Sequence, residues 1–155
     1  MSRAFVREPE GGEAYEDLPD RQVSPHPNLV TPSGLAQMDQ EVASLQQRLA
    51  DAQARDDKAE IARVSRDLRY WTYRRATAEL VPASSDTSHV RFGSRVTFER
   101  DDGRSQTYQI VGEDEADPAK GSISYVSPLA RALMGKEIGD AVPLPQGQAE
   151  IVRIE

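Results

Sequence analysis

Residues 35–80 read LAQMDQEVASLQQRLADAQARDDKAEIARVSRDLRYWTYRRATAEL. Apolar side chains recur here at alternating steps of three and four residues, which places them on one face of a helix. The first series is Leu35, Met38, Val42, Leu45, Leu49 and Ala52, and the second, after a polar break at 55–58, is Ile61, Val64, Leu68 and Trp71. Two such helices, joined by a short polar turn, bury their apolar faces against each other. The stretch therefore predicts an antiparallel coiled-coil hairpin over residues 31–81 with a charged tip.

The starts of both helices carry capping residues. Thr31 can N-cap the first helix, and Pro32 at the first helical position gives up only an N–H group that has no partner within the helix. Asp57 and Glu60 have the spacing of a capping box at the start of the second helix. We expect the second helix to continue to about Leu80.

The segments that flank the hairpin differ from it in composition. Residues 1–30 are rich in proline, hold few apolar side chains and show no periodicity. We expect them to form a flexible or loosely docked N-terminal tail. Residues 82–89 begin with proline and are rich in serine, which is typical of a linker.

From residue 90 onward the apolar period changes to two, which is typical of β-strands. Strands are expected at 96–98, 107–111, 122–126, 140–144 and 149–154. The turn Asp101-Asp102-Gly103 favours a hairpin between the first two strands. Ser127 and Pro128 begin a short helix that ends at Gly135. Residues 90–155 therefore predict a small antiparallel sheet with one short helix, and the chain as a whole predicts an α+β fold.

Composition narrows the classes of function. The 155 residues are 37% hydrophobic and 29% charged, with no cysteine and a net charge of -7. Without cysteine there are no disulfides and no thiolate chemistry. No apolar run reaches the ~18 residues of a membrane span, and the N-terminus lacks the apolar core of a secretory signal, so we expect a cytoplasmic protein. The negative charge argues against a protein that binds nucleic acid through bulk electrostatics.

Three runs in the C-terminal region carry a resemblance to a known family. They are IVGEDEAD at 110–117, ISYVSPLARAL at 123–133 and GKEIGD at 135–140. In this order and spacing they resemble the C-terminal domain of the GreA/GreB transcript-cleavage factors. The preceding hairpin is similar in kind to that of the family, so the resemblance covers residues 30–155.

The resemblance implies an FKBP-like C-terminal domain without isomerase activity. In the family this domain docks at the rim of the secondary channel of RNA polymerase, against a coiled coil of the largest catalytic subunit, while the hairpin enters the channel. Carboxylates at the hairpin tip help hold a second magnesium ion at the polymerase active site, where backtracked RNA is cut. The resemblance thus implies a monomeric factor that is not itself an enzyme and has no intrinsic cofactor. It also implies DNA binding at family level and no stably bound metal.

The resemblance assigns the tip role to Asp57 and Glu60, and Asp56 adds a third carboxylate. The alternative is an ordinary capping box. The family follows its Glu with an Asn and a Tyr, where this sequence has Ile61 and Val64. The hairpin of this sequence is also shorter than that of the family by about three turns per helix, or ~15 Å. Two effects on the polymerase therefore stay open: the protein stimulates RNA cleavage, or it occupies the channel without stimulating cleavage.

The resemblance also indicates contact between the hairpin and the 3′ end of the transcript. Its candidates are Arg63, Arg66 and Arg69. The alternative is a solvated helix face with ion pairs such as Arg63–Asp67.

For docking on the polymerase, the resemblance indicates the start of the short helix and the acidic loop before it. Its candidates are Tyr125, Val126, Ser127, Pro128, Leu129, Asp114 and Glu115. The alternative is a helix cap with a buried leucine, beside a solvated acidic loop. Two hypotheses of other classes also stay open: a stand-alone FKBP-like peptide-binding module, and a coiled coil that dimerises through the hairpin.

Overall fold

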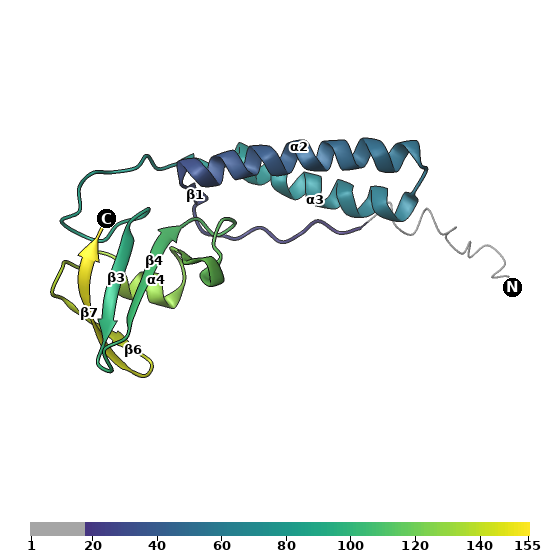
Figure 1. Cartoon of the computed structure of the whole chain (residues 1–155). Coiled ribbons are helices and arrows are strands. Elements are labelled where there is room, and N and C mark those ends of the chain that lie inside the picture. Colours follow the sequence, from purple (N-terminus) through teal and green to yellow (C-terminus); the bar gives the residue numbers. More distant parts are fainter. Residues whose placement is uncertain (1–17) are drawn as a thin grey trace, which may run out of the picture. The chain divides into compact units, whose positions relative to one another are not determined.

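The computed structural model describes residues 18–155 (Figure 1). The part of the predicted tail that precedes Leu18 lies outside the described residues. Contacts divide the chain into two compact units, which we describe separately. Within the described residues, the first unit comprises 18–25 and 38–77, and the second comprises 26–37 and 78–155. No helix among these residues is both long and apolar enough to cross a membrane.

The first unit is built around the predicted helical hairpin. Helix α2 spans Pro32–Ala54, and its residues from Met38 onward belong to this unit, while α3 spans Lys58–Ala76. Two ion pairs join the helices: Arg48 contacts Glu60, and Asp39 contacts Arg75. Because residues late in α2 pair with residues early in α3 and the reverse, the two helices run antiparallel (Figure 1).

The apolar seam between the helices is buried only in part. The buried apolar side chains of this unit are Met38, Leu45, Ala52, Ala62 and Val64. Other predicted seam positions, such as Leu49, Leu68 and Trp71, are half-buried. A hairpin of two helices has only one shared face, so side chains at its margins keep contact with solvent.

Helix α3 ends at Ala76, before the predicted end at Leu80. Strand β2, Glu79–Leu80, pairs in parallel with strand β1, Leu29–Val30. The backbone N–H of Glu79 donates to the carbonyl of Asn28 at 2.8 Å. These long-range backbone bonds replace the last predicted helical turn. Apolar periodicity does not detect such bonds, so the prediction placed the end of the helix too late.

The second unit contains a five-stranded sheet in the order β5-β4-β3-β7-β6. The strands are β3 Arg95–Arg100, β4 Ser105–Val111, β5 Ser122–Ser124, β6 Ala141–Leu144 and β7 Gly147–Ile154. Four strands pair antiparallel, but β4 and β5 run parallel. The prediction of an all-antiparallel sheet was wrong for this pair. The loop at 112–121, which includes the 3-10 helix η2 (Pro118–Lys120), carries the chain back to Gln109, so that β5 pairs with the last three residues of β4.

The α+β prediction is confirmed by these elements. The core of the second unit forms where alternate strand residues face α4, Pro128–Leu133. Val96, Phe98 and Ile110 are fully buried, and Leu133 of α4 packs with them. The ring of Phe98 stacks on Tyr108 with centroids 6.2 Å apart. The FKBP-like description of this unit stays a prediction.

Candidate functional site

The tip of the hairpin is closed by an N-cap at Asp57. Asp57 has extended backbone angles (φ -89°, ψ 90°), and its carboxylate accepts a hydrogen bond from the Glu60 N–H at 3.2 Å. In a complete capping box, the Glu60 side chain would also accept a hydrogen bond from the Asp57 N–H. Here the Asp57 N–H donates instead to the Ala52 carbonyl at 3.0 Å. The cap is therefore one half of a capping box, and the Glu60 carboxylate is left for other partners.

Those partners are two arginines. Arg48 of α2 donates to Glu60 at 3.0 Å, and Arg63, one turn along α3, donates at 3.0 and 3.3 Å. The hydrogen bond from Arg48, and then that from Arg63, lowers the pKa of Glu60 below its ordinary value. Glu60 thus stays ionised while its charge is offset by two guanidinium groups.

Asp56 occupies the turn itself. Its φ of 53° lies in the left-handed region, which aspartate tolerates better than most residues. Its side chain is 82% exposed and lies 3.5 Å from the Lys58 ammonium. Asp56 is therefore the most outward of the three predicted tip carboxylates.

Together the tip residues do not fit a magnesium shell. Within residues 18–155, no group of three or more His, Cys, Asp or Glu side chains is arranged to hold a metal ion. Asp57 is used as a cap, and Glu60 is held by two cations. Magnesium requires near-octahedral oxygen ligation, so no step through a metal follows from this chain alone.

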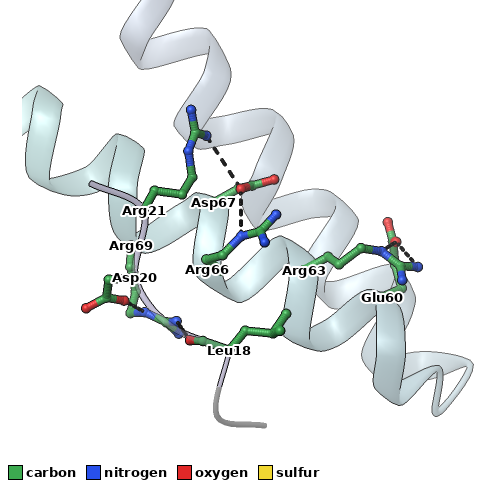
Figure 2. Close-up of polar contacts among 8 residues, drawn as sticks. All are labelled: Leu18, Asp20, Arg21, Glu60, Arg63, Arg66, Asp67 and Arg69. Atoms are coloured by element: carbon green, nitrogen blue, oxygen red, sulfur yellow. Dashed lines mark hydrogen bonds and ion pairs between the residues drawn. The ribbon is translucent and has the colours of Figure 1, made fainter. Parts of the chain in front are cut away.

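The three predicted RNA-contacting arginines, which form the arginine face of α3, each make an ion pair (Figure 2). Arg63 pairs with Glu60, Arg66 contacts Asp67 at 3.4 Å, and Arg69 contacts Asp20 at 2.6 Å. The predicted Arg63–Asp67 pair was wrong, because Arg63 turns back toward Glu60. The alternative of a solvated face with ion pairs thus matches the geometry of these three arginines.

Asp20 and Arg21 are interacting residues that sequence reasoning missed. Asp20 contacts Arg69, and the guanidinium of Arg69 also donates to the Leu18 carbonyl at 3.1 Å. Arg21 lies 3.5 Å from Asp67, with its guanidinium carbon 3.9 Å from the centre of the Tyr70 ring. The tail was expected to be either flexible or loosely docked, and residues 18–21 are docked on α3. No local pattern could have indicated it, since the partners are 46 to 51 residues away.

Of the predicted polymerase-docking residues (the docking set) at the start of α4, Pro128 is exposed. The Ser127 hydroxyl accepts a hydrogen bond from the Ala130 N–H at 3.2 Å and caps the helix. Pro128 follows at the first helical position and is exposed, whereas Leu129 is partly buried against the core. Val126 is half-buried and donates its N–H to the Ser124 hydroxyl. Among the predicted docking residues at the start of α4, Pro128 is therefore the one whose apolar side chain is exposed.

Two other residues of the predicted docking set, Tyr125 and Glu115, make contacts within the second unit. The Tyr125 hydroxyl donates to the Pro27 carbonyl, and its ring meets Phe92 edge-on with centroids 5.7 Å apart. Glu115 accepts hydrogen bonds from the N–H and hydroxyl of Thr31 and from the Gly112 N–H. These contacts give Glu115 a structural role. Asp114, in the same loop, is half-buried.

Comparisons with known proteins match the C-terminal region to a protein family. The family model "Transcription elongation factor, GreA/GreB, C-term" matches residues 85–155. A GreB of Neisseria meningitidis serogroup B is 43% identical over 98 aligned positions, and the match covers 61% of this chain and 60% of the relative. Among solved structures, GreA factor homolog 1 (Gfh1) of Thermus thermophilus matches 84% of this chain and 99% of its own, at 21% identity and a TM-score of 0.40.

The lengths of these matches differ. The chain spans 60% of the Neisseria GreB and 38% of a GreA from Desulfovibrio desulfuricans. A GreA of Rhizobium leguminosarum bv. trifolii is matched more fully: the alignment of 136 positions shows 35% identity and covers 73% of this chain and 84% of the relative. On that match, together with the family model, the chain belongs to the GreA/GreB family of transcription elongation factors.

Proposed function

We propose that this protein binds RNA polymerase through the second unit and inserts the α2–α3 hairpin into the secondary channel, where it modulates elongation. The observation that carries the proposal is the combination of a GreA/GreB C-terminal region with an antiparallel hairpin whose tip presents Asp56, Asp57 and Glu60. In this proposal the polymerase is the only enzyme, and the hairpin acts by occupying space beside its active site.

Of the two outputs left open by the sequence, the tip geometry favours occupation without cutting. Stimulated cleavage would require tip carboxylates free to complete a magnesium shell held by the polymerase. Glu60 is instead held by Arg48 and Arg63, and the cap bond engages Asp57. Helix α3 has only 19 residues, which limits its reach to about 28 Å.

A binding experiment tests the docking part. The full chain is expected to co-purify with core RNA polymerase, and Pro128→Glu is expected to abolish co-purification by placing a charge on the exposed start of α4. Pro145→Glu, at another exposed proline of the same unit, is the matched control and should bind normally. Equal binding by both variants would remove Pro128 from the interface.

A cleavage assay on stalled elongation complexes tests the output. The protein is expected to slow cleavage stimulated by an active GreA and to produce no cleavage of its own. Cleavage that appears with the wild-type chain and disappears in Asp57→Asn or Glu60→Gln would reverse this conclusion and assign the tip the metal-assisting role.

A further inference from the structure

Residues 18–23 form a short strap along α3, and its contacts are almost entirely polar. Asp20 accepts from Arg69 at 2.6 Å, and the Leu18 carbonyl accepts from the same guanidinium at 3.1 Å. Arg21 contacts Asp67 and covers the ring of Tyr70. Figure 2 shows the strap crossing α3 at Arg69, with Arg66 and Arg63 nearer the start of the same helix.

The strap uses the hydrogen-bond donors of Arg69 that a phosphate would otherwise use. Guanidinium groups bind carboxylates and phosphates through the same N–H groups. Asp20 and the Leu18 carbonyl together engage Nε and one terminal nitrogen of Arg69. Beside these contacts lies a pocket of about 310 Å³. It is lined by Asp20, Arg21, Val23, Arg69, Tyr70 and Tyr73.

The side chains of residues 18–23 are mostly exposed. Val23 is 41% exposed, and among residues 18–23 only Leu18 is half-buried. The ion pair itself lies at the surface, since the Asp20 and Arg69 side chains are 75% and 47% exposed. Exposed ion pairs are weak and are screened by salt. The strap can therefore leave α3 without opening an apolar core.

We infer that the strap is a built-in competitor for the arginine face of α3, with Asp20 in the place of a phosphate. Single-stranded RNA that approaches α3 gains Arg69 and the face of Tyr70 only when the strap is released. The choice of RNA as the ligand rests on the proposed function, whereas the competition rests on the contacts of Asp20 and Arg21.

A charge-matched pair of variants tests the competition. Asp20→Asn removes the carboxylate charge that pairs with Arg69, whereas Asp51→Asn removes the same charge from α2, where the Asp51 side chain contacts Gln47. By fluorescence anisotropy with a labelled RNA oligonucleotide at low salt, Asp20→Asn is expected to bind about fivefold more tightly than Asp51→Asn, the ratio that one exposed ion pair supports. In an Arg69→Gln background this difference should disappear. Equal affinities of the two variants would overturn the inference.

A second measurement follows the strap itself. The chain has no cysteine, so Gln22→Cys provides one site for a nitroxide label. In the free protein the label is expected to broaden the NMR signals of amides at 66–73, and saturating RNA should restore those signals. Broadening that persists when RNA is bound would show that the strap and RNA do not compete.

The outcomes also separate this inference from the proposed function. If neither the wild type nor Asp20→Asn binds RNA while the chain still co-purifies with polymerase, the inference fails and the proposed function stands. If RNA displaces the strap but the chain does not bind polymerase, the competition stands and the proposed function fails.

Discussion

The carboxylate of Glu115 accepts hydrogen bonds from both the backbone N–H and the hydroxyl of Thr31, 84 residues earlier in the chain. The Thr31 hydroxyl in turn accepts from the Gly34 N–H at 3.0 Å, so the predicted N-cap of α2 is present. The Gly112 N–H also donates to Glu115 at 3.2 Å. One side chain of the acidic loop therefore fixes the cap of α2 within the second unit.

Replacing Glu115 should destabilise the second unit. Glu115→Ala leaves the Thr31 N–H and the Gly112 N–H without their acceptor, which costs about 1–3 kcal/mol. Urea unfolding followed by circular dichroism measures the change. Glu150→Ala, an exposed position on β7, is the control and should stay within about 0.5 kcal/mol of wild type.

Gly34 should be required only while Glu115 is present. A Cβ at Gly34 would lie 2.2 Å from a carboxylate oxygen of Glu115, so Gly34→Ala forces that side chain away from Thr31. We expect a loss of about 1–3 kcal/mol in the wild-type background. In a Glu115→Ala background the same change should be neutral or stabilising, because alanine is favoured over glycine in a helix by about 1 kcal/mol. Additive effects in this double-mutant cycle would contradict the proposed clash.

Asp57 should stabilise α3 as an N-cap. Asp57→Ala removes the acceptor for the Glu60 N–H and should lower the free energy of unfolding by about 1 kcal/mol, while Asp57→Asn should retain most of it. Thermal unfolding of the two variants checks this. A loss of equal size in both would indicate that the charge, rather than the cap bond, stabilises the tip.

The pKa of Glu60 should depend most on Arg48. The hydrogen bond from Arg48 is the largest cause that lowers this pKa below 4.5, so Arg48→Gln should raise it toward that value. Because the folded-state pKa is the lowered one, the stabilisation is present above about pH 4.5 and is lost as the pH falls through the folded-state pKa. A pH titration of the Glu60 carboxyl carbon by NMR measures both, and an unchanged pKa in the variant would remove Arg48 as the cause.

Local patterns in the sequence were enough to predict much of this structure. The spacing of the apolar residues predicts the hairpin, and the residue types predict the caps at Thr31 and Asp57. The dipeptide Asp102-Gly103 predicts the turn between β3 and β4. Each of these depends on neighbours within a few residues, where backbone geometry limits the alternatives.

Long-range pairing could not be predicted in this way. Strands β1 and β2 have two residues each, too few to show a period, and together they shorten α3. The hydrogen bonds of Glu115 depend on Thr31, and the ion pair of Arg69 depends on Asp20, 49 residues away. Charged residues on a surface have many candidate partners, and only the fold selects among them. The resemblance likewise indicated the tip carboxylates, but not the pairing of Glu60 with Arg48 on the neighbouring helix.

The most direct test of the proposed function is site-specific crosslinking from the hairpin tip. Because the chain has no cysteine, Arg55→Cys, at an exposed position beside Asp56, can carry a single photoactivatable crosslinker. In complexes with core RNA polymerase, we predict crosslinks to the walls of the secondary channel in the largest catalytic subunit, and their loss in a Pro128→Glu background. Crosslinks confined to the outer surface of the polymerase, or unchanged by Pro128→Glu, would contradict the account.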